Sequence, residues 1–453
     1  MGESFIICFA AFLFAILIVQ LSLPAFNHLS NKALSLSYLL DLKLILQYIG
    51  LFLITGFLAG LYPSIIISNY NPVKTLYSRF KLSSKNYLQK GLVVIQFAMA
   101  TLLIIATITI YNQFNFLTNK DLGYDDSNIV LIEKNSLSRN EAKVFKEELL
   151  KNPNIIDVAP KNGGGWGTRA KINGDTEIGF DFETVDASYL PIFKIPLKDG
   201  RNFSSDFPAD STSSVLVNES FVREAGWDNP LGEEVDFWYN ENDKYKVVGV
   251  VKDYHFSSLS QEIRPQLFTM KPSNPYGMAI IKIRPGSETE SLKHIEATFK
   301  KLFPVNPFSY EFKDLANLKQ YEAEAKWKQM MLFGAFLTIF ISGIGLFGLS
   351  VLSAQRRIKE IGVRKVLGAS VQVVVAILSV DFLKLVAISL LLAMPLAWIL
   401  INKWLEKYPY RIEVGWQIFA IAGFTVMAIA FITVSFQSIK AAITNPVNSL
   451  RSE

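Results

Sequence analysis

The chain has 453 residues, of which half are hydrophobic and 19% are charged, and its formal net charge is +5. A positive mean hydropathy beside so many charges requires the apolar residues to be concentrated in blocks. This pattern excludes an ordinary water-soluble protein and favours a membrane protein with a soluble part. A single cysteine, Cys8, excludes an intrachain disulfide and a cysteine-based metal site.

Six apolar blocks are long enough to cross a bilayer, which takes about 20 residues. They cover residues 5–23, 44–67, 91–111, 330–354, 382–401 and 416–436. The first block has no basic flank and no clean small-x-small cleavage site. We therefore interpret it as a spanning helix rather than a signal peptide.

Basic residues predict how these spans are oriented. Residues 69–90 contain five lysines and arginines and no acid, and residues 356–370 contain five against Glu360 alone. By the positive-inside rule both loops are cytoplasmic. Six alternating spans then place both termini in the cytoplasm and the long segment after the third span outside. The chain is thus expected to be a multi-pass membrane protein whose long segment is extracytoplasmic.

The long segment after the third span predicts an acidic, folded outer domain. Residues 120–326 contain 33 acidic and 26 basic residues, a net charge of −7, which leaves +12 for the rest of the chain. The positive charge therefore belongs to the membrane part, where it faces lipid head groups and cytoplasmic partners. No nucleic-acid binding is implied.

This outer segment has the pattern of a mixed α/β domain. Strands are predicted at residues 128–133, 177–186, 244–253 and 277–284. Apolar residues at helical spacing predict an amphipathic helix with Ser287 as its N-cap. Residues 112–120 and 315–328 are expected to extend the adjoining spans as helices. The second contains no glycine or proline and is expected to run as one rod into the membrane.

The expected fold class is thus an α-helical membrane domain of six transmembrane helices with an inserted extracytoplasmic α/β (α+β) domain. No enzyme motif accompanies it: the chain has no Gly-Lys dipeptide and no G-x-S-x-G or H-E-x-x-H sequence. Three histidines, His28, His255 and His294, fall in different segments, and we interpret His255 as a solvated loop residue. Glycine-rich residues 162–167 lack a following helix that would direct an anion site and are interpreted as an ordinary loop.

A short repeat links the two ends of the chain. Residues 61–76 and 435–450 both end in Asn-Pro-Val-x-[Ser/Thr]-Leu, at an offset of 374, and two spans precede each copy. This predicts a duplicated helical unit, which is common in transport proteins.

The order of span, outer domain, span, "RRIKEIGVRKVLGAS", two spans and "NPVNSLR" resembles the permease subunits of MacB/FtsX-type ABC transporters, the mechanotransmission class. The resemblance implies a two-helix repeat at residues 1–76, the tail of a preceding unit, and a linker with the third span at 77–112. It further implies a MacB-like periplasmic core domain with stalk helices at 113–327 and an FtsX-like permease domain at 328–453. A shortened gene product, a truncated reading frame and a dimerising subunit all remain open as explanations of the incomplete first unit.

In such permeases the loop between the second and third spans of a unit is a coupling helix that docks onto a separate nucleotide-binding subunit. The resemblance therefore implies a docking surface formed by Arg357, Glu360, Ile361, Gly362, Arg364, Lys365, Leu367, Gly368, Ala369 and Ser370. The i,i+4 spacing of Glu360 and Arg364 helps a short helix to form, and Gly362 and Gly368 would allow close backbone approach. Alternatively, the basic cluster only enforces topology and contacts anionic lipid.

Small residues in two spans predict close helix packing, with or without sliding. They are Gly56, Gly60, Gly334, Gly343, Gly345 and Gly348.

The resemblance implies a permease subunit that couples ATP hydrolysis in a separate ABC ATPase to movement of its periplasmic domain. The expected role is export of an envelope-side substrate such as a peptide, antibiotic or lipoprotein, with ATP and magnesium held by the partner and no cofactor in this chain. A second permease unit or a homodimer, and a periplasmic adaptor or cell-wall enzyme, are the other expected partners. Two alternatives are an FtsX-like signalling device that activates a cell-wall hydrolase and an ATP-independent membrane receptor.

Overall fold

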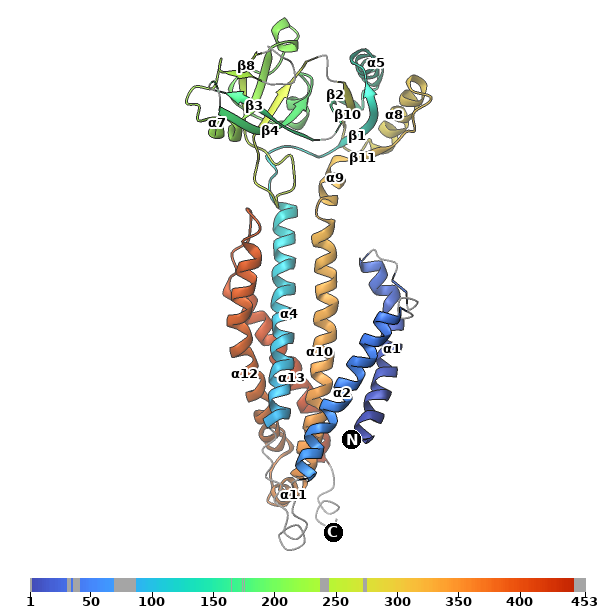
Figure 1. The fold of residues 1–453 in the computed structure, drawn as a ribbon, viewed down its shortest axis with the longest axis vertical. Helices are drawn as coiled ribbons and strands as arrows, with labels where there is room; N and C mark the ends of the chain where they lie inside the picture. The colour runs from blue at the N-terminus through green and yellow to red at the C-terminus, as the bar shows by residue number, and fades with distance from the viewer. Residues whose placement is uncertain are drawn as a thin grey trace. The chain divides into compact units, whose positions relative to one another are not determined.

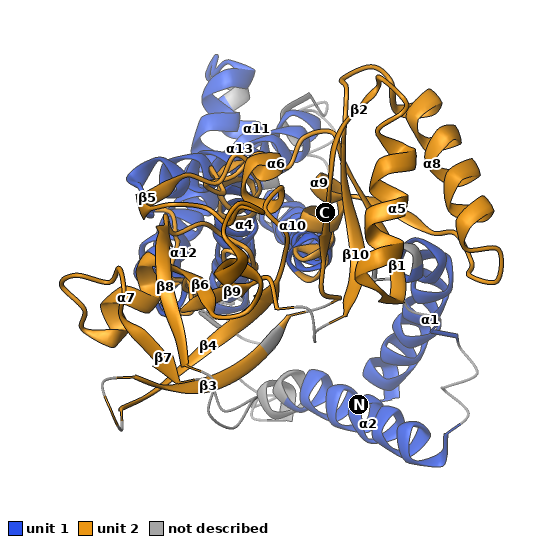
Figure 2. Ribbon diagram, turned by 90° about the horizontal axis from the view of Figure 1, so that it is seen from above, with its two compact units in different colours: residues 1–112, 324–404, 413–453 blue, residues 113–323, 405–412 orange. Residues whose placement is uncertain are grey.

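The computed structural model describes residues 2–30, 34–35, 41–68, 87–163, 165–172, 174, 176–236, 244–271 and 275–443. It divides into two compact units, coloured separately in Figure 2. Residues 1–112, 324–404 and 413–453 form what we term the membrane unit. Residues 113–323 and 405–412 form the outer unit.

Long apolar helices make up the membrane unit (Figure 1). They are α1 (Gly2–Ser30), α2 (Leu42–Ser68), α4 (Tyr87–Asn119), α10 (Glu322–Arg356), α12 (Val371–Leu405) and α13 (Trp416–Ile443). All six are long and apolar enough to cross a membrane, which confirms the six predicted spans within the described residues. Several of these helices are longer than the apolar run that predicted them. Once a helix has formed, each further residue that adopts helical geometry adds one backbone hydrogen bond.

Sheet A of the outer unit is antiparallel, with the strand order β11-β1-β10-β2. Its strands are β1 (Ile129–Leu137), β2 (Ile155–Lys161), β10 (Tyr276–Ile283) and β11 (Tyr310–Phe312). Helices α5 (Arg139–Leu149) and α8 (Glu288–Leu302) lie beside it in both ribbon views. Phe145 of α5 and Phe299 of α8 are almost fully buried and pack with Ile281 of β10, so these helices cover the apolar face of the sheet.

Sheet B has the strand order β5-β8-β6-β9-β4-β3-β7, and β7 pairs with β8 as well. Its strands are β3 (Trp166–Ile172), β4 (Thr176–Thr184), β5 (Leu197–Gly200), β6 (Ser214–Asn218), β7 (Glu234–Asp236), β8 (Lys244–Val251) and β9 (Gln266–Thr269). The extra pairing closes β8, β6, β9, β4, β3 and β7 into a ring. Phe221 of α7 (Glu219–Ala225) packs into the core of this sheet. Such closure leaves few unpaired strand edges.

A shared apolar cluster joins the two sheets. Ile129 and Ile280 of sheet A pack with Leu216 and Phe268 of sheet B and with Tyr189 of α6 (Tyr189–Phe193). Each of the four aliphatic and phenylalanine side chains is at most 1% exposed. The two sheets therefore form one folded body rather than two independent lobes.

Polar groups cross the same junction at the ends of β2 and β4. Lys161 forms a bridge pair with Val185, and its ammonium lies 2.5 Å from Oε2 of Glu183. Burial raises the pKa of the Glu183 carboxyl, and the neighbouring Lys161 ammonium opposes that rise. Burial also lowers the pKa of Lys313 to about 8. The junction thus holds charges that are stable only together.

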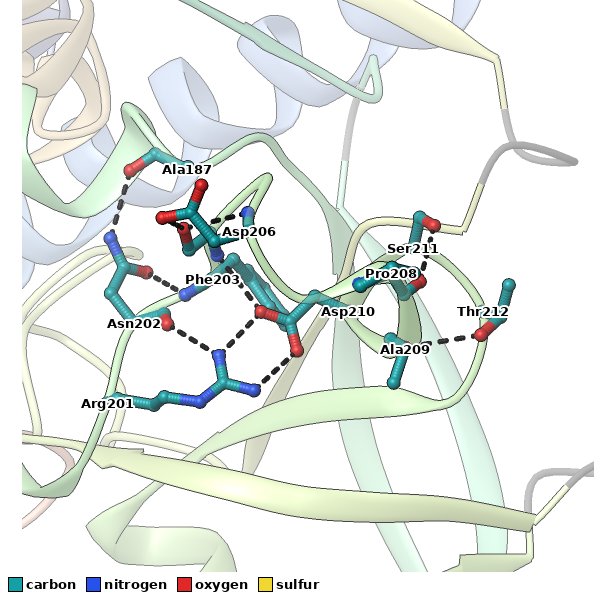
Figure 3. A network of polar contacts seen from close by, with 11 residues as sticks. Ala187, Arg201, Asn202, Phe203, Asp206, Pro208, Ala209, Asp210, Ser211 and Thr212 are labelled. Atoms are coloured by element: carbon teal, nitrogen blue, oxygen red, sulfur yellow. Dashed lines mark hydrogen bonds and ion pairs between the residues drawn. The ribbon is translucent and has the colours of Figure 1, made fainter.

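Another buried carboxylate fixes the connection between β5 and β6. Figure 3 shows the guanidinium of Arg201 bound to both oxygens of Asp210, at 2.6 and 2.8 Å. Asp210 lies in the 3-10 helix η2 (Pro208–Ser211), is 1% exposed, and also accepts the N–H of Ser204 at 3.0 Å. The amide of Asn202 donates to the carbonyl of Ala187 at 2.9 Å. This bidentate pair holds the connection in one conformation.

The strand predictions are confirmed, since β1, β4, β8 and β10 lie at the four predicted positions. Helix α8 also begins where it was expected, but the hydroxyl of Ser287 makes no capping bond to the helix and donates instead to the carbonyl of Arg284. Of the glycine-rich residues 162–167, Asn162 is buried and bonded to Thr184, so this end is fixed rather than loose. Gly164 lies outside the described residues.

The prediction of one unbroken rod over residues 315–328 is wrong. Helix α9 (Lys313–Lys319) ends before residues 320–321, and α10 begins at Glu322. The cause is Tyr321, which is 4% exposed and packs with Leu117 and Leu259. Its hydroxyl accepts the main-chain N–H of Leu259 at 2.9 Å. Tertiary packing therefore overrides a strong local helix propensity.

We expect Lys161→Met to destabilise the outer unit by about 3 kcal/mol, because Glu183 would lose its closest cation. Lys313 provides a second positive charge near Glu183. We therefore expect a loss of stability at the lower end of the range for breaking a buried ion pair. The measurement is the free energy of unfolding by urea titration of the full chain in detergent.

The matched control is Arg169→Met, which removes an exposed ion pair to Glu177 at 3.6 Å and should cost less than about 1 kcal/mol. In Lys161→Met the pKa of Glu183 is further raised, so the folded state holds a proton that the unfolded state releases. The deficit should therefore shrink as the pH falls through the raised folded pKa of Glu183 in the variant. Equal losses in both variants, with no pH dependence, would contradict this account.

Candidate functional site

The segment predicted as a coupling helix forms α11 (Ile358–Val366), between α10 and α12. Gly368 ends it with a φ of +92°, and the N–H of Ala369 donates to the carbonyl of Arg364 at 2.9 Å. This is the geometry of a helix stop at a left-handed glycine. No described atom lies within 4 Å of a Cβ built on Gly368, and its part in close backbone approach to a partner stays a prediction.

One face of α11 is anchored to α12. Ile361 is 8% exposed and packs with Val374 and Leu378. The guanidinium of Arg357, just before the helix, pairs with the carboxylate of Asp381 at 2.8 Å. An aspartate in a long apolar helix is costly unless it is paired. These contacts fix the orientation of α11 on the membrane unit.

The opposite face of α11 is exposed and mixed in character. Val363 is 50% exposed, and Leu367, which directly follows the helix on the same side, is 80% exposed. Glu360 and Arg364 form an i,i+4 ion pair at 2.8 Å beside them. The face therefore presents two apolar side chains next to an ion pair that keeps both charged groups in place.

The structure sorts the predicted docking residues into groups. Glu360, Arg364 and Leu367 lie on the exposed side, whereas Ile361 and Ala369 pack inward. Gly362 is buried, and Ser370 begins α12 by accepting the N–H of Val373 on its hydroxyl at 3.4 Å. The side chain of Lys365 lies outside the described residues.

Val363 belongs to the exposed face but was not predicted. It precedes Leu367 by four residues, so the helical period could have placed both on one side. The helical period alone does not show which side of α11 packs against the rest of the protein. That is decided by Val374, Leu378 and Asp381 in the next helix.

The predicted packing glycines differ in their surroundings. A Cβ at Gly56 would meet the ring of Phe5 at 2.6 Å, and one at Gly345 would meet Gln96 at 2.8 Å. Gly60 is buried, and Gly343 lies near Thr433. Among the described residues nothing lies within 4 Å of a Cβ at Gly334 or Gly348, and their packing role stays a prediction.

His255, predicted as a solvated loop residue, lies in the loop between β8 and β9 and is half-buried. Its ring meets the ring of Tyr410 edge-on, at 4.7 Å between centroids and an interplanar angle of 90°. Burial, and then the Lys120 ammonium, lower the pKa of His255. The imidazole is therefore neutral at pH 7. Among the described residues no group of three potential metal ligands surrounds it or any other position.

Several predictions concern residues that the structure does not describe. The basic residues 69–86 and both copies of the Asn-Pro-Val repeat, at 71–76 and 445–450, lie outside the described part of the chain. The side chain of His28 does so too.

Comparison with protein families matches both parts of the chain. Residues 92–295 match the MacB-like periplasmic core domain, and residues 332–446 match the FtsX-like permease C-terminal domain. The chain belongs to the MacB/FtsX-type permeases of ABC transporters. The recognition made from the motifs is thereby confirmed, as is the fold class of six spans with an inserted extracytoplasmic domain.

Individual relatives are distant and longer than this permease. Macrolide export ATP-binding/permease protein MacB of Aggregatibacter actinomycetemcomitans is 24% identical over 201 residues, which cover 41% of this chain and 30% of that protein. Pyoverdine export ATP-binding/permease protein PvdT of Pseudomonas savastanoi pv. phaseolicola is 24% identical over 238 residues, 48% of this chain and 34% of that protein. The chain thus spans about one third of the length of these curated relatives.

Among solved structures, the periplasmic region of MacB from Actinobacillus actinomycetemcomitans is 20% identical to this permease. The match covers 44% of this chain and 94% of that one, with a TM-score of 0.34.

The anchor of α11 can be tested by truncating one side chain on each face. Ile361→Ala should weaken local stability by about 2–4 kcal/mol, because it removes a buried side chain from a small cluster. Amide hydrogen exchange of residues 358–366 in the full chain should then accelerate. Val363→Ala is the matched control and should change stability by no more than about 0.5 kcal/mol. Equal acceleration in both variants would show that α11 has no anchored face.

Proposed function

We propose that this chain is the permease subunit of an ABC transporter whose ATPase is a separate subunit that binds α11. The observation that carries the proposal is the two-sided construction of α11. Its inner face is fixed by Ile361 and by the Arg357–Asp381 pair, while Val363 on the helix and Leu367 directly after it are exposed. A rigid helix with an exposed apolar anchor is a common mode of docking into a groove.

The charges around this face support a protein partner in addition to lipid. Arginine is among the side chains enriched at binding hot spots, where the surrounding contacts exclude water. Here Arg364 is held by Glu360 beside the exposed, apolar Leu367. Attraction to anionic lipid requires only positive charge, whereas here an acid is built into the exposed face.

In the proposed arrangement α11 and both termini are cytoplasmic and the outer unit is periplasmic, in a bacterial inner membrane. The partner binds ATP and magnesium. Two permease units, from a second subunit or a homodimer, receive the two ATPase subunits. ATP binding brings the docked helices together and shifts each outer unit between two arrangements.

Export of an envelope-side substrate is the activity that we favour for this permease. Both named relatives are export proteins, and each carries its ATP-binding part and its permease part in one protein. The substrate class proposed here is a peptide, an antibiotic or a lipoprotein that reaches the outer unit from the envelope side.

Leu367→Ala should weaken binding of the partner ATPase at least about fivefold, because we expect truncation of this anchor to cost more than about 1 kcal/mol. The measurement is the dissociation constant of the candidate ATPase for the full chain in lipid nanodiscs, with ATP turnover as the second readout. The matched control is Leu318→Ala, which truncates a leucine on α9 that is 48% exposed and should leave binding unchanged. Unaltered affinity in Leu367→Ala, and also in Glu360→Ala and Arg364→Ala, would contradict the docking assignment.

A further inference from the structure

The loop between α12 and α13 is bound to the end of helix α4 by one glutamine. Gln113 is 1% exposed, and its Nε2 donates to the carbonyl of Tyr410 at 2.9 Å. Its Oε1 accepts the N–H of Ile412 at 3.0 Å. The amide therefore uses both its donor and its acceptor on the main chain of the loop, as a neighbouring strand would. Both partners belong to the outer unit.

Aromatic packing reinforces these two bonds. Tyr408 and Tyr410 pack against the buried cluster of Leu117, Leu259 and Tyr321. This cluster also creates the break between α9 and α10. Four segments that are remote in sequence therefore meet at one place: the end of α4, the loop that holds Leu259, the junction of α9 with α10, and the loop that follows α12.

Electrostatics favours the same contact. The Nζ of Lys120 lies 4.9 Å from the centre of the Tyr410 ring, a cation–π distance. His255 meets the same ring edge-on. The lowered pKa of His255 keeps it neutral although Asp253 and Asp121 are near, so the cation in contact with the ring of Tyr410 is Lys120.

We infer that Gln113 is a transmission residue, which makes the α12–α13 loop a third mechanical connection to the outer unit beside the two stalk helices. Tyr410 and Ile412 are followed within a few residues by α13, and α12 ends at Leu405, just before them. A displacement of these two spans is then passed to α4 through main-chain hydrogen bonds. The inference rests on the proposed function, because it assumes that the spans move when the partner binds ATP.

The test uses the full chain with its ATPase in nanodiscs and compares Gln113→Ala with Asn119→Ala. Asn119 is the matched control: it is an exposed amide on the same helix, and it bonds only to the carbonyl of Asn115 one turn away. Without nucleotide, the amide of Ile412 should exchange at least about tenfold faster in Gln113→Ala, because its acceptor is lost. Gln113→Glu retains an acceptor for the N–H of Ile412 but no donor for the carbonyl of Tyr410. The exchange rate of Ile412 in this variant should lie between the rates in Gln113→Ala and Asn119→Ala.

The second readout is the change in amide exchange of the outer unit on adding ATP. We expect Gln113→Ala to lose at least half of that change while the ATPase still binds normally. If the loop is released and the ATP-dependent change is undiminished, Gln113 is a structural contact only and the inference is wrong. If the unaltered chain shows no response to ATP, the proposed function fails instead. In that case the amide exchange of Ile412 without nucleotide still tests whether Gln113 holds the loop. Normal protection of Ile412 in Gln113→Ala would overturn that part of the inference.

Discussion

The base of the outer unit depends on the buried side chain of Tyr321. Its ring fills the space between Leu117 at the end of α4 and Leu259, and its hydroxyl satisfies a main-chain N–H that would otherwise be buried without a partner. To bring this hydroxyl into place the helix is interrupted at residues 320–321, which separates α9 from α10. The resulting cluster is also the surface on which Tyr410 rests. One satisfied tyrosine thus determines where a stalk ends and where a distant loop can dock.

The long-range contact of Tyr321 illustrates which parts of the fold could be predicted from the sequence and which could not. Membrane spans and half-buried strands are recorded in the order of apolar residues, and both were predicted at the right places. The break at Tyr321 has no local signal, because the surrounding residues are strong helix formers and the partner that matters, Leu259, is 62 residues away. Strand β6 was missed for a related reason: all five of its residues are buried, so it shows no alternation. Helix α5, in contrast, did carry a signal, a capping box of Ser138 and Glu141.

The candidate site shows the same division. Composition and motif located α11, and the helical period groups Val363 with Leu367. The direction of the helix depends on Asp381 and Leu378, and neither residue is within the motif. Ile361 therefore looked like part of a docking surface, although it is the anchor that makes a docking surface possible. The sequence of a motif alone does not show which of its residues are exposed and which are buried. The helix against which the motif packs decides this.

The two stalks differ in continuity, and this difference determines the effect of Gln113. Helix α4 runs for 33 residues without a break, about 50 Å at 1.5 Å per residue. The other stalk contains the joint at Tyr321 between α9 and α10. A continuous helix carries rotation and translation along its whole length, whereas a joint absorbs part of both. Gln113 lies on the continuous helix, one turn before Leu117, so any force that the α12–α13 loop exerts acts on the stiffer of the two stalks. In the proposed mechanism the hydrogen bonds of Gln113 then add to the movement of α4, and the joint at Tyr321 lets the second stalk follow without straining the sheets of the outer unit.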